Sequence, residues 1–139
     1  MQPMVSQAVP IPAEPLTDQH SAVMIVEDEA SSRRALSLLL SSCGYPTLAF
    51  ASAEEALEAI GRERTPRIAL IDLDLPGMNG LELIQRLQQL DPFVFPVLIT
   101  ATSGEMLSAK LHNRPLAYLR KPLDFESLLA LLSQREWRH

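Results

Sequence analysis

The chain has 139 residues, a length typical of one domain and long enough to bury a hydrophobic core. Hydrophobic residues make up 47% and charged residues 21%, and the formal net charge of −5 argues against direct binding of nucleic acid. The single cysteine excludes an internal disulfide framework, and the longest apolar run is too short to cross a membrane. The first residues lack the basic start and apolar block typical of a secretory signal, so we expect a cytoplasmic domain.

The first twenty residues differ in composition from the rest of the chain. Four of the eleven prolines lie within the first fifteen residues, which carry one charge, Glu14. A segment of this kind does not offset the entropy lost when a chain becomes ordered. We therefore expect residues 1–20 to be a mobile extension and residues 21–139 to be the folded domain.

The first half of that domain alternates short apolar runs with helical periodicity. Residues 23–26 form an apolar run that ends abruptly in acidic residues, as a buried strand does at the edge of a sheet. A helix follows, and then a second strand over residues 47–50. Ser52 and Glu55 have the spacing of a capping box for another helix, which we expect to end at Gly61. The inward-facing residues predicted for these two helices are Ala35, Leu36, Leu39 and Leu40 in the first and Ala56, Leu57 and Ile60 in the second.

The second half repeats the pattern. Strands are predicted over residues 68–71, 97–100 and 116–119, with a weak helix over residues 105–111 and a last helix capped by Asp124. The inward-facing residues predicted here are Leu81, Ile84 and Leu87 after the third strand and Phe125, Leu128, Leu129 and Leu132 in the last helix, with Trp137 packing near its end.

Five strands therefore alternate with five helices. The strands are continuous apolar runs rather than alternating ones, which is typical of a parallel sheet covered by helices on both faces. The sequence predicts a single α/β domain.

Polar residues follow the predicted strands where their carboxyl ends meet, the edge at which parallel sheets bind ligands. The residues are Glu27 and Asp28 after the first strand, Asp72 and Asp74 at the third, Thr100 at the fourth and Lys121 after the fifth. Clustered carboxylates favour a hard cation such as Mg²⁺, while an ammonium and a hydroxyl are donors suited to a phosphoryl group. The pattern indicates Mg²⁺-assisted phosphoryl chemistry on an aspartate.

Four motifs in this order resemble the receiver domain of two-component response regulators. They are VEDE at 26–29, IDLDLPGMNG at 71–80, LITA at 98–101 and YLRKP at 118–122. The resemblance covers nearly all of the chain outside the extension. It implies a (βα)₅ flavodoxin-like three-layer sandwich with a parallel sheet of strand order 2-1-3-4-5.

The resemblance also implies a role for each residue of the site. Asp72 matches the phospho-acceptor, which takes a phosphoryl group from a sensor histidine kinase or a histidine phosphotransfer protein. The Mg²⁺ ligands implied are Glu27 through water, Asp28, Asp72 and the backbone carbonyl of Asp74. Lys121 matches the lysine that pairs with the phosphoryl oxygens, Thr100 the switch hydroxyl and Tyr118 the aromatic that moves with it.

The implied output is a change of surface rather than a reaction, so we expect a signalling domain and not an enzyme. The surface combines the helix over residues 105–111, the strand over residues 116–119 and the last helix. If the chain is complete, it has no room for an attached output domain, so we expect a downstream protein target, no direct DNA binding, no membrane contact and a possible homodimer through this face. The segment from His112 to Leu116 departs from the family, which often has small residues there, and puts recognition on this face in doubt.

Two other functions fit parts of the pattern. One is a pseudo-receiver, a binding module that uses the fold without phosphorylation. The other is a haloacid-dehalogenase-like phosphatase, whose Asp-x-Asp nucleophile resembles the segment from Asp72 to Asp74. That enzyme class needs a further acidic pair on a later strand, and only eighteen residues follow Lys121.

Overall fold

The computed structural model describes residues 22–60, 66–112 and 114–136. The strands are β2 (Val23–Val26), β3 (Thr47–Phe50), β4 (Ile68–Asp72), β5 (Phe95–Thr100) and β6 (Ala117–Arg120). The helices are α2 (Ala30–Ser42), α3 (Ala53–Ile60), α4 (Gly80–Leu90), α5 (Gly104–Leu111) and α6 (Phe125–Glu136). The expected extension over residues 1–20, the helix end at Gly61 and the packing of Trp137 lie outside the described residues.

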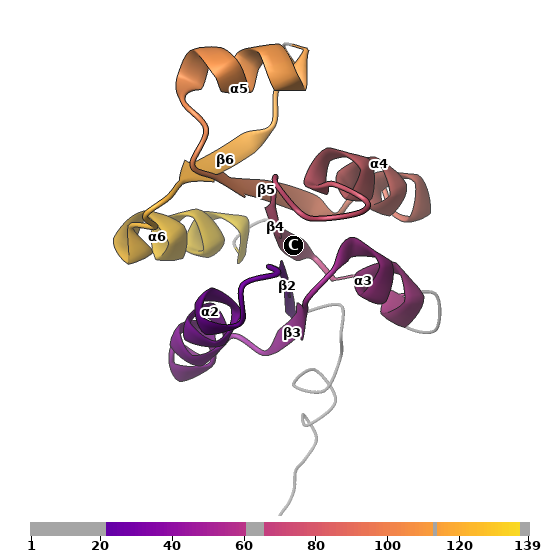
Figure 1. Ribbon diagram of the computed structural model, residues 1–139. Coiled ribbons are helices and arrows are strands. Elements are labelled where there is room, and N and C mark those ends of the chain that lie inside the picture. Colours follow the sequence, from indigo (N-terminus) through magenta and orange to yellow (C-terminus); the bar gives the residue numbers. More distant parts are fainter. Residues whose placement is uncertain (1–21, 61–65, 113, 137–139) are drawn as a thin grey trace, which may run out of the picture.

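All five strands form one parallel sheet in the order β3-β2-β4-β5-β6. Counted along the chain this is the order 2-1-3-4-5, so the predicted fold class is confirmed (Figure 1). The order reverses between β2 and β4, because the chain leaves β2 toward one edge and returns to build the other. Ligands bind where strand order reverses in such sheets, outside the carboxyl ends of the strands.

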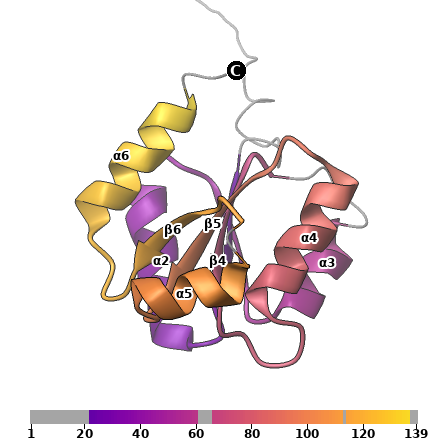
Figure 2. The ribbon, with the colours of Figure 1, turned by 90° about the horizontal axis from the view of Figure 1, so that it is seen from above.

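Helices cover both faces of the sheet. Figures 1 and 2 show α2 and α6 on one side and α3 and α4 on the other. Leu36 and Leu40 of α2 share a buried cluster with Leu128 and Leu132 of α6. The opposite cluster contains residues of α3 and α4 together with Leu107 of α5. The sheet and the helices on its two faces therefore form a three-layer sandwich.

Strand β5 begins two residues earlier than predicted, because Pro96 is accommodated within it. The N–H of Phe95 donates to the carbonyl of Arg67, on the β4 side. Successive backbone nitrogens point to opposite sides of a strand, so the nitrogen of Pro96 faces β6. Pairing with β6 starts only at Val97, so the missing N–H of the proline breaks no ladder bond.

Two residues predicted to face inward are exposed. Ala35 is exposed because the buried stripe of α2 follows Leu36 and Leu40, and a neighbouring position on a helix is rotated away by about 100°. Phe125 is 43% exposed because it is the first residue of α6, beyond the end of β6, where no strand covers it. The last strand is also shifted by one residue from the prediction, to Ala117–Arg120, and α5 begins at Gly104 rather than at residue 105.

Asp124 caps the start of α6 as predicted. Its carboxylate accepts hydrogen bonds from the N–H of Glu126 at 3.2 Å and the hydroxyl of Ser127 at 2.8 Å. The Ser52 hydroxyl likewise accepts the N–H of Glu55 at 3.1 Å, which confirms the cap predicted for α3.

Candidate functional site

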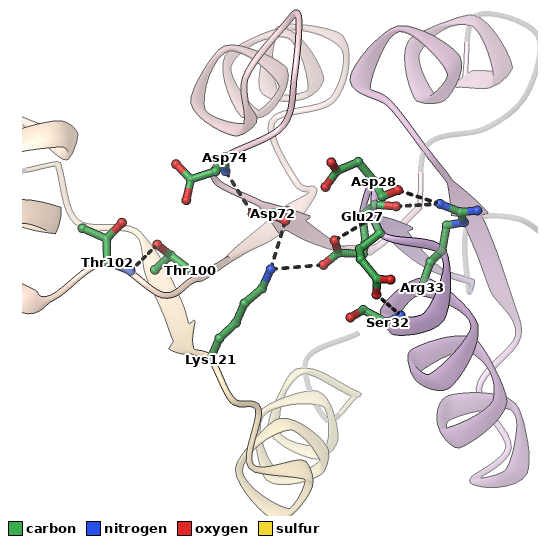
Figure 3. A network of polar contacts seen from close by, with 10 residues as sticks. Glu27, Asp28, Ser32, Arg33, Asp72, Asp74, Thr100, Thr102 and Lys121 are labelled. Atoms are coloured by element: carbon green, nitrogen blue, oxygen red, sulfur yellow. Dashed lines mark hydrogen bonds and ion pairs between the residues drawn. The ribbon is translucent and has the colours of Figure 1, made fainter.

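Four of the six polar residues predicted from the strand ends, Glu27, Asp28, Asp72 and Lys121, lie close together at the carboxyl edge of the sheet (Figure 3). Glu27 follows β2, Asp72 ends β4 and Thr100 ends β5. These three are the buried polar or charged side chains of the described part of the chain, with exposed fractions of 2%, 4% and 0%. Burying polar groups is unfavourable unless they are paired, so their partners define what the site does.

Three carboxylates form the acidic part of the site. One oxygen each from Glu27, Asp28 and Asp72 lie within 4.8 Å of one another. Asp28 is exposed, whereas the other two are buried, so the cluster is open to solvent on one side. An all-oxygen donor set with carboxylates from two neighbouring strand ends fits Mg²⁺, which binds one or two carboxylates and keeps several waters.

Lys121 supplies the positive charge that the cluster needs. Its Nζ lies 3.1 Å from Oδ2 of Asp72 and 3.4 Å from Oε1 of Glu27. Burial alone lowers the pKa of Lys121, but the hydrogen bond and negative charge of Asp72, together with Glu27, outweigh it and raise the pKa above its usual value. The ammonium therefore stays charged beside the carboxylates and is available to an anionic group placed there.

Glu27 is held by the backbone of the loop after β2. Its Oε2 accepts a hydrogen bond from the N–H of Glu29 at 3.0 Å. Burial raises the pKa of Glu27 and the negative charge of Asp72 adds to this, while the Glu29 N–H and Lys121 oppose it. A carboxylate with a raised pKa is one whose charged form gains most from a cation arriving nearby.

Asp72 is fixed on both of its oxygens. While Oδ2 faces Lys121, Oδ1 accepts a hydrogen bond from the N–H of Asp74 at 2.9 Å. The backbone after Asp72 is pressed against the start of α4, because a Cβ on Gly80 would lie 2.4 Å from the Asp72 carbonyl oxygen. Only glycine allows this approach, so Gly80 sets the path of the loop that leaves the site.

The side chain of Asp74 points away from the acidic cluster. Its Oδ1 lies 3.5 Å from Nζ of Lys110, on α5, and both side chains are about half exposed. The family resemblance implies a role for the backbone carbonyl of Asp74, and this ion pair of its side chain was not predicted. The ion pair with Lys110 joins α5 to the loop that follows the central aspartate.

Thr100 and Tyr118 lie apart from the cluster. The Oγ1 of Thr100 accepts the N–H of Thr102 at 2.9 Å, and no hydrogen bond joins it to Asp72 within the described residues. Tyr118 is 45% exposed on β6, because it is one of the outward-facing residues of an edge strand. Thr100 lies at the end of β5 and Tyr118 on the exposed side of β6, and neither makes a hydrogen bond to the acidic cluster within the described residues.

Three contacts of the site region were not predicted. Nη1 of Arg33 donates to the carbonyl oxygens of Glu27 and Asp28. Oε2 of Glu54, on α3, accepts the N–H of Met78 at 3.1 Å, and Lys110 pairs with Asp74 as described. Each joins a charged helix residue to a loop, and only for Arg33, one helical turn after the acidic pair, does the spacing itself suggest a contact.

Comparison with known proteins gives one consistent result. The family model described as "Response regulator receiver domain" matches residues 23–133. Among curated proteins, the chain is 31% identical over 117 residues to the DNA-binding transcriptional regulator NtrC of Escherichia coli K12, a match covering 84% of this chain and 25% of that protein. It is 28% identical over 107 residues to the sporulation initiation phosphotransferase F of Bacillus subtilis, covering 76% of this chain and 86% of that protein.

Solved structures agree with the sequence matches. The Vibrio cholerae chemotaxis protein CheY4 superposes with a TM-score of 0.72 at 26% identity, covering 82% of this chain and 97% of that one. The chain spans only about a quarter of the length of NtrC.

The helices of the described residues do not include one with the length and hydrophobicity needed to cross a membrane.

Proposed function

Because the chain belongs to the response regulator receiver family, whose domains accept phosphoryl groups from histidine kinases or phosphotransfer proteins, we propose that Asp72 is its phospho-acceptor. Such domains are signalling modules of two-component systems rather than enzymes. The observation that carries the proposal is the buried carboxylate of Asp72, 3.1 Å from the Lys121 ammonium and within an open cluster of three carboxylates.

The proposed reaction is an in-line transfer from a phosphohistidine. A carboxylate oxygen of Asp72 attacks the phosphorus, a P–O bond forms, and the P–N bond breaks with its electron pair going to the histidine nitrogen. Lys121 is already placed to pair with the oxygens of the group that arrives. The product is an acyl phosphate on Asp72, and no other co-reactant is required.

Mg²⁺ would be held by Asp28, by Asp72, by Glu27 through water and by the backbone carbonyl of Asp74. When bound, it would neutralise charge on the phosphoryl oxygens during transfer. One carboxylate oxygen of each of Glu27, Asp28 and Asp72 lies within 4.8 Å of the other two, which supports this assignment. The side chain of Glu27 is one carbon longer than that of aspartate, and its carboxylate lies within the cluster.

The proposed output is a shift in population between two packings of the surface formed by α5, β6 and α6. The Thr100 hydroxyl would leave the Thr102 N–H for the phosphoryl group, and Tyr118 would move from its exposed position toward the space left behind. A buried hydroxyl at the end of β5 and a half-exposed aromatic on the neighbouring strand β6 are consistent with such a switch. The two residues therefore report the state of Asp72 to the outer surface.

The proposed partners are a sensor histidine kinase or phosphotransfer protein as donor and a downstream protein as target. An acidic chain with net charge −5 fits a protein target better than DNA, and a homodimer through the α5, β6 and α6 surface is a further proposal. We also propose that the receiver domain covers residues 21–139, that residues 1–20 form an extension, and that the protein acts in the cytoplasm, where it meets its donor.

The test is phosphorylation by acetyl phosphate. The 139-residue chain, incubated with acetyl phosphate and Mg²⁺, is expected to gain the mass of one phosphoryl group, and alkali should remove it. Asp72→Asn is expected to abolish the gain. Asp74→Asn is the matched control, because it removes a neighbouring carboxylate outside the cluster and should leave the site of labelling intact.

Three outcomes would contradict the proposal. Equal labelling of wild type and Asp72→Asn would show that another residue accepts the group. A wild-type chain that takes up no phosphoryl group in the presence of Mg²⁺ would favour a pseudo-receiver, the binding module without phosphorylation. Steady hydrolysis of a phosphate ester, lost in Asp72→Asn, would instead favour the phosphatase.

A further inference from the structure

Arg33 contacts the acidic loop through its backbone and not through its carboxylates. Nη1 donates to the carbonyl oxygen of Glu27 at 2.9 Å and lies 3.5 Å from that of Asp28 (Figure 3). Arg33 belongs to the first turn of α2, so its own position is set by that helix. A guanidinium with several donors in a fixed plane is suited to holding two neighbouring carbonyl groups at once.

Because Arg33 donates to carbonyl oxygens, it does not occupy the carboxylate oxygens of Glu27 or Asp28. Within the described residues the Asp28 carboxylate has no hydrogen bond or ion pair, although an arginine lies one helical turn away. A direct Arg33–Asp28 ion pair would compete with a metal for the same oxygens. As placed, Arg33 fixes the peptide that carries both acidic residues while Asp28 and Glu27 still offer an oxygen each to the cluster.

The rest of the loop is held from the same helix. The carboxylate of Glu29 caps α2 by accepting the N–H of Ser32 at 2.8 Å, and the N–H of Arg33 donates to the Glu29 carbonyl. Glu27 in turn accepts the N–H of Glu29. The loop between β2 and α2 is therefore tied to the first turn of the helix, and the Arg33 guanidinium adds contacts to the carbonyls of Glu27 and Asp28.

We propose that Arg33 is a positioning residue for the cation site, which holds the Glu27–Asp28 peptide so that both carboxylates face Asp72. This inference rests on the proposed function, because it concerns the Mg²⁺ that the site would hold. It assigns a role to a basic residue that makes no contact with the proposed ligand oxygens.

Positioning and charge predict opposite results. If Arg33 acted only as a nearby positive charge, its removal would reduce repulsion and strengthen Mg²⁺ binding. If it positions the loop, its removal lets the carboxylates move and weakens binding. Loss of groups that orient metal ligands typically reduces affinity about 10–100-fold, and because Arg33 acts on backbone carbonyls we expect about tenfold.

The experiment measures Mg²⁺ affinity of the 139-residue chain by isothermal titration calorimetry at constant ionic strength. Arg33→Met removes both the charge and the donors, and Arg33→Lys keeps the charge and loses the planar fork. Arg34→Met is the matched control, because Arg34 is the next residue of α2, is exposed and makes no hydrogen bond or ion pair with the described residues of the loop. We expect about tenfold weaker binding for Arg33→Met, a smaller loss for Arg33→Lys and no loss for Arg34→Met.

A readout without metal separates positioning from a general loss of structure. In metal-free protein the amide resonances of Glu27, Asp28 and Glu29 should shift in Arg33→Met, while those of β4 and α6 stay unchanged. If Arg33→Met does not fold, Arg33→Lys decides the matter, because any weakening in a variant that keeps the charge reflects lost hydrogen-bond geometry.

Binding by Arg33→Met that equals or exceeds that of wild type would overturn the inference. An equal loss in Arg34→Met would overturn it as well, because the effect would then not depend on the hydrogen bonds that Arg33 donates to the loop. Wild-type protein that binds no Mg²⁺ would overturn the proposed function along with it, whereas wild-type binding with an unaffected Arg33→Met would overturn this inference alone.

Discussion

Helices α4 and α5 follow the two strands that end at the centre of the site, and they pack in the same hydrophobic cluster, yet they are attached to the sheet differently. Helix α4 buries Gly80, Leu83, Ile84 and Leu87, whereas α5 buries only Leu107 and Leu111. Asn79 caps α4 with its side chain, but Ser103 at the start of α5 makes no side-chain cap bond.

The difference indicates which helix can respond to the site. Helix α4 is fixed by its cap, by its buried stripe and by the close contact of Gly80 with the Asp72 carbonyl. Helix α5 is held by two buried leucines and an exposed ion pair. Segments with few buried contacts open at lower free energy, so we expect α5 rather than α4 to move when Asp72 changes.

The largest effect expected from this comparison comes from the two glycines that begin the helices. Gly80→Ala would place a Cβ 2.4 Å from the Asp72 carbonyl oxygen and 3.0 Å from the Leu73 Cα. Because both neighbours are backbone, we expect a loss of about 3 kcal/mol in the free energy of unfolding, measured by urea denaturation.

Gly104→Ala is the matched substitution in α5, where nothing lies within 4 Å of the added Cβ. Alanine restricts the unfolded chain and favours the helix, so we expect a gain of about 0.4–1 kcal/mol. Equal losses in the two variants would contradict the claim that the helices are attached differently.

The helix caps should give a smaller difference of the same kind. Oδ1 of Asn79 accepts the N–H of Glu82 at 2.9 Å, so Asn79→Ala is expected to cost about 1 kcal/mol. Ser103→Ala removes no cap bond and should stay within about 0.5 kcal/mol of wild type. Thermal unfolding of both variants checks this, and a larger loss for Ser103→Ala would reverse the comparison.

The ion pair between Lys110 and Asp74 joins the two regions and should contribute less again. Both side chains are about half exposed, and such pairs contribute about 0.2–1 kcal/mol. A double-mutant cycle with Lys110→Ala and Asp74→Asn measures the coupling energy, which we expect to decrease in high salt because exposed charges are screened. A coupling energy of zero at low salt would show that α5 is not tied to the loop after β4.

The smallest effect concerns the loop before α4, which Glu54 holds from α3. The backbone N–H of Met78 donates to its carboxylate and keeps the pKa of Glu54 below its ordinary value of 4.5. A lowered folded-state pKa means that this contact stabilises the fold above pH 4.5 and is lost as the pH falls through the folded-state pKa.

An NMR titration of the Met78 amide should therefore show a transition with its midpoint below pH 4.5. Glu54→Gln should abolish that transition, since the neutral amide does not titrate. A midpoint above 4.5 would show that the contact does not favour the charged carboxylate.

Much of the fold follows from sequence because its pattern is local. The apolar run from Val23 to Val26 and the acids after it identify a buried strand and its carboxyl end, and the same holds at Asp72. Once the strand ends are known, the parallel fold brings Glu27, Asp72 and Lys121 together, as in the structure.

The remaining features depend on tertiary contacts that the pattern does not contain. Leu83 is fully buried although the predicted stripe of its helix ran through Leu81, Ile84 and Leu87, because the helix presents a wider face to the sheet. Phe125 was expected to face inward from spacing alone, but the sheet does not extend to the start of α6. The contact of Glu54 with Met78 joins residues 24 positions apart, beyond any local signal.

The sheet divides the hydrophobic core into two separate clusters, one on each of its faces. Along β4, Ala69 and Ile71 belong to the cluster under α3, α4 and α5, whereas Ile68 and Leu70 belong to the cluster under α2 and α6. Free-energy changes of distant sites without shared partners add, while those of neighbours do not. The core residues on one face can therefore be replaced together by those of a relative while the residues on the other face are kept. A substitution that compensates for a change in the core should likewise be sought on the same face of the sheet.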